Sequence, residues 1–337
     1  MANRMEHQVG IKAESSYNTP VTVDRFVPYL DGTEGNWDTR QRQGQGVMVS
    51  TRRGFRGDRR VLPIGQGEVV IKAEAGSRQF GLLLEAAAGA GTVTAITGGS
   101  LQLFFTPSIP GTVMPKSYTI QLAKVRNDGT VDTETFGGCT AVSAEIECPE
   151  DDILTVQVTF DARSYQTGVP LAVASYTAAS YLFDHSQGAA GVGGTLVAPT
   201  TTTLASGLTP FGAIRSWKLE WEQNADIERW VLGGRNQPTV GILEPEFTAD
   251  VEYNDTTLRT AYLAGTGLPV TVTHTTTEVV GSGNSQLQVA IPQLFLESPV
   301  TPGMADETAV VGITGKVTYN NTHDLFYIGY RTADTAL

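Results

Sequence analysis

The chain has 337 residues, a formal net charge of −12 and a charged fraction of only 17%, against about 25% in an average globular protein. This length predicts about two domains, and the apolar fraction of 40% is enough to fill their cores. The acidic balance argues against a protein that grips nucleic acid over its whole surface, because such proteins are usually basic. Abundant Thr, Val and Gly favour a mainly β fold.

The chain start and the cysteines indicate where the protein is made. The opening MANRMEHQVG lacks the apolar segment of a secretory signal, and no run reaches the roughly 18 apolar residues of a membrane helix. Cys139 and Cys148 lie nine residues apart in a segment that reads as one strand, so they could meet only if it turned back. We therefore expect two reduced, small core residues and synthesis in a cytoplasm.

An extended segment, residues 9–30, precedes an Arg-rich stretch, residues 39–60, that differs from the rest of the chain. The stretch holds seven arginines and one aspartate, a local charge of +6, so the remainder carries −18. Its four glycines favour a loop or arm over a core element. Attraction between the opposite charges predicts that the arm contacts an adjacent subunit or ring. Its arginines are Arg40, Arg42, Arg52, Arg53, Arg56, Arg59 and Arg60.

The first half of the chain then reads as strands around one helix. Residues 68–74 alternate between a polar and an apolar face. Ser77 predicts the N-cap of a helix over 78–88 that Gly89 ends. Further strands are predicted over 101–107, 117–125, 131–138, 140–148 and 153–163.

Low charge and many Ala, Gly, Thr and Ser residues predict an extended linker over residues 171–212. It separates a first domain, residues 1–170, from a second, residues 213–337. Strands in the second domain are predicted over 213–223, 227–234, 246–253, 268–280, 285–295, 309–320 and 325–332, with a helix after Asp255.

The two halves share a repeated unit. Residues 246–267 align without a gap to residues 68–89, at an offset of 178. The alignment places Asp255 on Ser77, both of them favoured N-cap residues, and Gly267 on Gly89. A β segment series follows each helix. We therefore predict a duplication: two β domains of one kind, each with one helix covering a sheet.

Residue patterns that would indicate catalysis or metal binding are missing. The sequence has no G-x-S-x-G, Walker A lysine or H-E-x-x-H motif, and no Cys/His spacing suits zinc. Glu150, Asp151 and Asp152 are interpreted as a solvated turn between strands. The scattered histidines are interpreted as surface or loop residues: His7, His185, His274 and His323. We predict that the protein is not an enzyme and uses no cofactor or metal.

Five segments together resemble the major tail tube proteins of long, non-contractile-tailed bacteriophages, in particular those with two tube domains in one chain. The ordered set covers most of the chain. The segments are GIKAESSYNTPVTVDRFVPYL, EVVIKAEAGSRQFGLLLEAAAG, FGGCTAVSAEIECPEDDILTVQVTFDARS, SWKLEWEQNADIERWVLGG and EPEFTADVEYNDTTLRTAYLAGTG.

The resemblance implies a fold and an assembly. Each domain would hold two roughly orthogonal antiparallel sheets, as a sandwich or half-barrel, with one short helix. Inner strands of neighbouring subunits would join into a β-barrel around a lumen, and stacked rings would form a tube that conducts DNA during ejection. Because typical members form rings of six domains, a two-domain chain implies a trimer. The implied partners are further copies, the tape measure, the tail terminator, the distal tail protein and passing DNA. The implied location is the virion tail, after assembly in the host cytoplasm.

The alternation assigns the polar faces of the inner strands to the lumen, because the apolar faces must cover the core. The two aligned strands then give a net charge of −4 per chain, or −12 per trimer. An acidic wall would repel DNA phosphates and let the genome slide. Alternatively, these faces form the outer surface and keep the tube soluble. The predicted lumen residues are Glu68, Lys72, Glu74, Glu145, Glu147, Glu220, Glu222, Glu246, Asp250 and Glu252.

Other functions remain open at this point. The protein could be another tail component, such as a tube terminator or distal ring protein. It could be a β-sandwich binding or adhesion module, or an enzyme. A carbohydrate binder would expose an aromatic platform, for which Trp217, Trp221 and Trp230 are candidates. Trp217 and Trp221, however, alternate with charged residues, and this pattern favours a place in the core.

Overall fold

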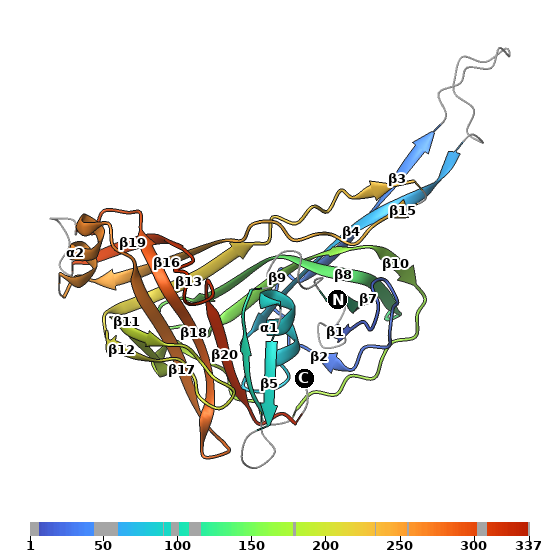
Figure 1. Ribbon diagram of the computed structural model, residues 1–337. Helices are drawn as coiled ribbons and strands as arrows, with labels where there is room; N and C mark the ends of the chain where they lie inside the picture. Colours follow the sequence, from blue (N-terminus) through green and yellow to red (C-terminus); the bar gives the residue numbers. More distant parts are fainter. Residues whose placement is uncertain are drawn as a thin grey trace, which may run out of the picture.

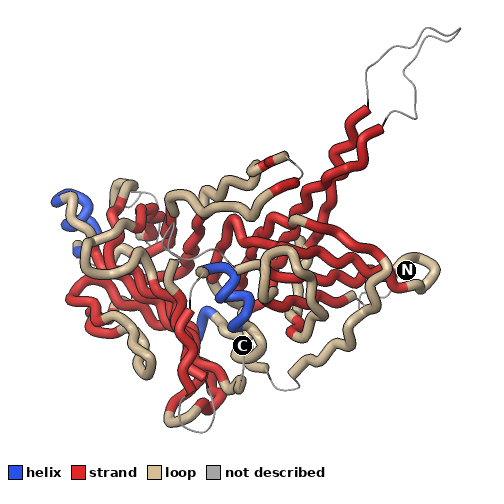
Figure 2. Tube along the Cα trace, turned by 45° about the vertical axis from the view of Figure 1, so that its right-hand side comes forward, coloured by secondary structure: helices blue, strands red, loops and turns tan. Residues whose placement is uncertain are grey.

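A computed structural model of the chain describes residues 7–43, 60–89, 91–95, 101–107, 116–177, 180–232, 234–254, 256–301 and 309–335. Antiparallel strands make up most of its regular structure, with two short α-helices (Figures 1 and 2). The predicted mainly β class is confirmed. The sheets pack around a hydrophobic core that both halves of the chain share.

The first half contains two antiparallel sheets that are linked by one long strand, β8 (Val131–Cys148). The part before Gly138 pairs with β7 (Tyr118–Val125) and β10 (Ser164–Thr167), and β7 pairs with β1 (Gln8–Ala13), which pairs with β2 (Arg25–Phe26). The part after Gly138 pairs with β9 (Thr155–Ala162), followed by β4 (Arg60–Glu74) and β3 (Glu34–Gln43).

Gly138 has a φ of +63°, a conformation that glycine adopts without strain, at the point where β8 passes between the two sheets. The two strands predicted over 131–138 and 140–148 are therefore one bent strand. Residues 150–152 form the turn between β8 and β9, as predicted. Cys139 and Cys148 are both buried and unbonded on β8, which confirms their predicted role.

The second half repeats this plan. One sheet contains β13 (Ile214–Glu222), β16 (Glu244–Glu252) and β19 (Val310–Val317), and β18 (Gly283–Leu296) links it to the other. The other sheet contains β12 (Ser206–Pro210), β11 (Gly188–Val197), β17 (Leu268–Val280), β18 and β20 (Tyr327–Thr332). The shorter elements are η3 (His185–Gln187), β14 (Trp230–Val231) and β15 (Gly234–Arg235).

Three findings differ from the predicted elements. The segment predicted as a linker, residues 171–212, contains β11 and β12, which belong to the second sheet of the second half. The single strand predicted over 227–234 is replaced by β14 and β15, a narrow hairpin of two-residue strands. From the first half, β5 (Gly91–Ala95) and β6 (Leu101–Phe105) extend the second half's sheet through the β6–β20 pairing.

The helices α1 (Gly81–Ala88) and α2 (Thr257–Ala264) have eight residues each. Ser77 is not an N-cap: Phe80 precedes the helix, and the buried Ser77 hydroxyl accepts a hydrogen bond from the Tyr181 N–H. Thr256 precedes α2, and Asp255 lies outside the described residues. Gly89 ends α1 as predicted, whereas α2 ends at Gly265 instead of Gly267.

The repeat therefore contains a small length difference. The strands before the helices end at Glu74 and Glu252, which are 178 residues apart, but the helices begin 176 residues apart. The connection is thus two residues shorter in the second half. A gapless alignment could not reveal this, because it keeps the spacing between strand and helix constant.

The interpretation of all four histidines as surface or loop residues is wrong for His274. Its side chain is buried on β17, where the Trp217 Nε1–H donates a hydrogen bond to its Nε2 at 3.2 Å. Its Nδ1 lies 3.0 Å from the Asp184 carbonyl oxygen. Trp217 and Trp221 are buried as well, so neither forms part of an exposed aromatic platform.

Candidate functional site

A direct pairing of strands joins the two halves into one sheet. Residues 143–148 of β8 pair with residues 217–222 of β13 in an antiparallel register. The strand order is therefore β3–β4–β9–β8–β13–β16–β19 across the whole molecule. Figure 1 shows this sheet running from the hairpin β3–β4 to the region of α2. Its alternating faces decide where the predicted site residues lie.

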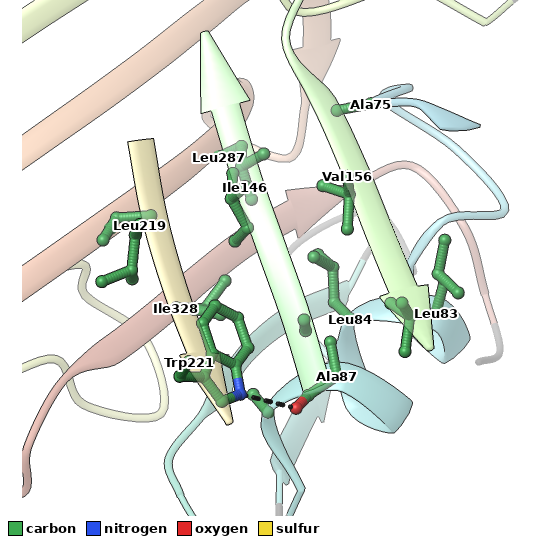
Figure 3. Close-up of a cluster of buried hydrophobic side chains, with 14 of the residues drawn as sticks. Ala75, Leu83, Leu84, Ala87, Ile146, Val156, Leu219, Trp221, Leu287 and Ile328 are labelled. Carbon is green, nitrogen blue, oxygen red and sulfur yellow. Dashed lines mark hydrogen bonds between the residues drawn. The ribbon is translucent and has the colours of Figure 1, made fainter. Parts of the chain in front are cut away.

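One face of the joined sheet is buried and the other is polar. On the buried face, Ile71, Ile146 and Leu219 have no exposed surface, and Phe247 has almost none. Figure 3 shows Ile146, Leu219 and Trp221 pointing into the core beneath the sheet. The neighbouring residues along each strand project from the opposite face, because side chains alternate along a strand.

The register aligns one residue from each of six strands into one row on the polar face, and five of the six are charged. Lys72 lies opposite Gln157, which lies opposite Glu145. Glu220 lies between Glu145 and Glu246, and Glu246 lies opposite Lys316. Three carboxylates are therefore direct cross-strand neighbours, an arrangement that destabilises a sheet.

All ten residues predicted for a common surface lie on this face, and each is exposed or half-buried. Sequence reasoning missed Lys218, Glu244 and Lys316, which continue the same alternation on β13, β16 and β19. With them included, the polar face of the central strands carries ten carboxylates and three ammonium groups, a net charge of −7. The segments counted are 68–74, 143–147, 155–159, 216–222, 244–252 and 312–316.

Lys218 partly neutralises the acidic row. Its ammonium group lies 2.6 Å from a Glu220 carboxylate oxygen and 3.2 Å from one of Glu145. The hydrogen bond to Glu220 raises the pKa of Lys218, so it stays charged. Glu222, Glu244 and Glu246 border an open hollow of about 300 Å³, and Lys218 is not among the residues that line it. The net negative charge of this surface can repel anions.

The comparison with protein families identifies the class of protein that carries this surface. A family model described as phage tail tube protein matches residues 6–319. The chain belongs to this family. No curated protein matches it. As a tail tube protein, it is a structural component of the virion tail.

The two ends of the Arg-rich arm of this tail tube protein lie on the paired antiparallel strands β3 and β4. Figure 1 shows β3 and β4 projecting from the body together, beyond the other strands. Arg40, Arg42 and Arg60 lie on these two strands, at positions where no side chain is described. The remaining arginines lie outside the described residues: Arg52, Arg53, Arg56 and Arg59.

A second arm, residues 223–243, occupies the corresponding place in the repeat, between β13 and β16. It crosses to the first half, where Arg235 forms a fully buried ion pair with Asp161 on β9. Arg235 also donates to the carbonyl oxygens of Ile227 and Ala162, and its own carbonyl accepts from the Arg163 Nε–H at 2.9 Å. No sequence pattern indicates this contact, because a single arginine in a loop is normally solvated.

Neither of the two α-helices is long and apolar enough to cross a membrane, as far as the tail tube protein is described. Among the same residues, no group of three or more His, Cys, Asp or Glu side chains is placed to hold a metal ion.

Proposed function

We propose that three copies of this tail tube protein form a ring of six similar domains, and that stacked rings form the tube through which phage DNA passes. The observation that carries the proposal is the β8–β13 junction, where the sheet of one half continues into the sheet of the other. A chain that joins two domains in this way contains one complete domain–domain junction. The same junction, repeated between chains, closes a ring.

The two ends of the joined sheet support this reading. Within the described residues, β3 pairs with β4 alone, so its other edge is open. At the far end, β19 pairs with only the last three residues of β18, and just beyond them the Glu297 N–H donates to the Thr314 carbonyl at 2.8 Å, so this edge has no strand partner at residues 310–313 among the described residues. Open edges invite uncontrolled pairing unless they are covered. Head-to-tail pairing of the two different edges covers both, and it generates a closed ring when the rotation closes.

The repeat supports three copies for a ring of six domains. Since each chain supplies two units of one plan, three chains supply six. Around the ring, the β8–β13 junction within each chain then alternates with a junction between chains, which involves β3.

The acidic face of the sheet is assigned to the lumen. A net charge of −7 per chain gives −21 for three copies on the central strands. DNA carries about one negative charge per 1.7 Å of its axis, so a basic wall would hold it at every ring. An acidic wall repels the phosphates and leaves the genome free to move. The proposed partners are further copies, the tape measure, the tail terminator and the distal tail protein, with assembly in the host cytoplasm.

Electron microscopy of the purified protein tests the proposal. Rings with three chains that stack into hollow tubes are expected. Single rings that never stack would instead indicate a tube terminator or a distal ring protein. Particles that remain monomers at high concentration would contradict ring formation and favour a binding or adhesion module.

A further inference from the structure

The two helices of the repeat differ in what covers them. All eight residues of α1 are buried, whereas α2 buries only Leu258 and Ala261. Leu263, in the last turn of α2, is 72% exposed. The helices have the same length and follow corresponding strands, so the difference comes from their surroundings. The first half and, through β20 and Trp221, the second half together cover α1, whereas no described residue of this chain covers the end of α2.

Trp221 of β13 covers the C-terminal end of α1. Its Nε1–H donates a hydrogen bond to the Ala87 carbonyl oxygen at 3.2 Å (Figure 3). The last carbonyl groups of a helix have no partner within the helix, so this donor satisfies one of them. Its ring also packs against Phe326, with 5.0 Å between centroids, and it is 2% exposed. Trp221 therefore fastens β13 of the second half to the helix of the first.

The strand register identifies a counterpart of Trp221 in the first half. Trp221 lies opposite Pro245 of β16. The offset of 178 residues between the aligned strands places Pro245 on Gly67, and Gly67 lies opposite Trp37 of β3. The two tryptophans thus hold the same position on corresponding strands. Trp37 is half-buried, stacks on Tyr165 at 5.6 Å, and lies on the strand whose other edge is open.

We propose that Trp37 of one copy packs against the C-terminal turn of α2, residues 263–265, in the next copy, as Trp221 packs against α1 within the chain. The occupant of this surface is a second copy of the same chain, and the inference rests on the proposed ring. The contact covers Leu263 and brings an indole N–H to the carbonyl groups that end α2. It also gives the β3 edge a fixed place beside the second domain.

Cross-linking between chains identifies the contact. Chains carrying Trp37→Cys are co-assembled with chains carrying Leu263→Cys and treated with a short bis-maleimide, so a cross-linked dimer arises only between copies. The native thiols stay unreactive because both are buried, which raises the pKa of Cys139 and raises that of Cys148 to about 12. Val279→Cys replaces Leu263→Cys as the control, since Val279 is equally exposed at 73%.

A dimer with Leu263→Cys and none with Val279→Cys supports the contact. Rings that form without the 37–263 product overturn it and leave the proposed function standing. A wild-type protein that forms no rings overturns the proposed function, and the contact with it.

A second comparison leaves Trp37 in place. Leu263→Glu should raise the protein concentration needed for ring formation by about tenfold or more, because a buried leucine contact is lost and a charge is brought into it. The matched variant Val279→Glu should leave this concentration unchanged. Both substitutions lie at exposed sites, so circular dichroism should show an intact fold. Equal behaviour of the two variants would overturn the proposal.

Discussion

His274 is a titratable group placed in the core in its neutral form. Its Nε2 accepts from Trp217, so protonation at that atom would break the hydrogen bond. Burial lowers the pKa of His274. The unfolded chain takes up a proton near pH 6.5, while the folded protein does not until lower pH, so stability falls as pH falls below about 6.5.

We predict that acidification from about pH 7 to about pH 5.5 lowers the free energy of unfolding by about 1 kcal/mol more in the wild type than in His274→Gln. Urea unfolding at both pH values measures this difference. Titrating carboxylates contribute equally to both proteins and cancel. His323→Gln, which removes a histidine outside the core, should follow the wild type. The same pH dependence in His274→Gln would show that His274 does not govern it.

The buried pair of Arg235 and Asp161 is the second residue-scale case. Burial raises the pKa of Asp161, and the hydrogen bond from Arg235 opposes this rise. Both side chains are almost fully buried. Removing one member of such a pair leaves the other charge without compensation, which is more costly than losing the pair as a whole.

Arg235→Met should therefore lower the free energy of unfolding by about 3 kcal/mol or more. Adding Asp161→Asn should recover part of the loss. The matched control is Arg126→Met, whose partner Asp132 and own side chain are exposed, so a much smaller change is expected, because exposed ion pairs contribute little to stability. Chemical unfolding of the four proteins checks this. An Arg235→Met loss as small as the control's would contradict the role of the pair in anchoring the second arm.

At the scale of elements, the two arms start from corresponding hairpins but have different roles. The second arm rests on the first half of its own chain through Arg235. By the repeat, the arm of residues 39–60 would reach the neighbouring copy or ring in a similar way. Each exposed ion pair is worth only about 0–1 kcal/mol, so several of its arginines must act together.

Replacing Arg52, Arg53, Arg56 and Arg59 with Ser should impair tube polymerisation while each domain stays folded. Turbidity and electron microscopy measure polymerisation, and circular dichroism checks the fold. Raised salt should weaken wild-type polymerisation in the same direction, because it screens the charges. Normal tubes from the fourfold variant would refute a role for the arm in assembly.

How far the sequence predicts these elements depends on whether the signal is local. Alternation identified the polar faces of β4, β8, β13 and β16, because a strand's two faces follow from its own residues. It could not show that β8 pairs with β13, since pairing between distant strands leaves no local pattern. The same holds for the β6–β20 pairing and for β11. Ser77 does not cap the helix, because its hydroxyl accepts a tertiary hydrogen bond from the Tyr181 N–H instead.

The same distinction between local and long-range signals applies to the site residues. The ten acidic and basic residues proposed to face the lumen were found from alternation, but the alignment of four of them in one row needed the register of the strands. The roles of Trp37 and Leu263 needed the repeat and the structure together. Trp37 alone reads as an ordinary strand residue, and only its correspondence with Trp221 connects it with a helix end.

On the scale of the whole molecule, one sheet runs through both halves of the chain, and the proposed ring would continue it from copy to copy. The two halves share one core and one continuous sheet, so neither is a free-standing unit. Three carboxylates in adjacent strands are unfavourable in an isolated monomer. They are consistent with a surface selected for what passes over it in the assembly.

A reconstruction of the assembled tube by cryo-electron microscopy tests the central claim most directly. The account predicts three chains per ring with pseudo-sixfold symmetry, and Glu145, Glu220 and Glu246 pointing into the lumen. Glu74 and Glu252 should lie on the same inner wall. Six chains per ring, or Glu74 and Glu252 both pointing outward to bulk solvent, would contradict it.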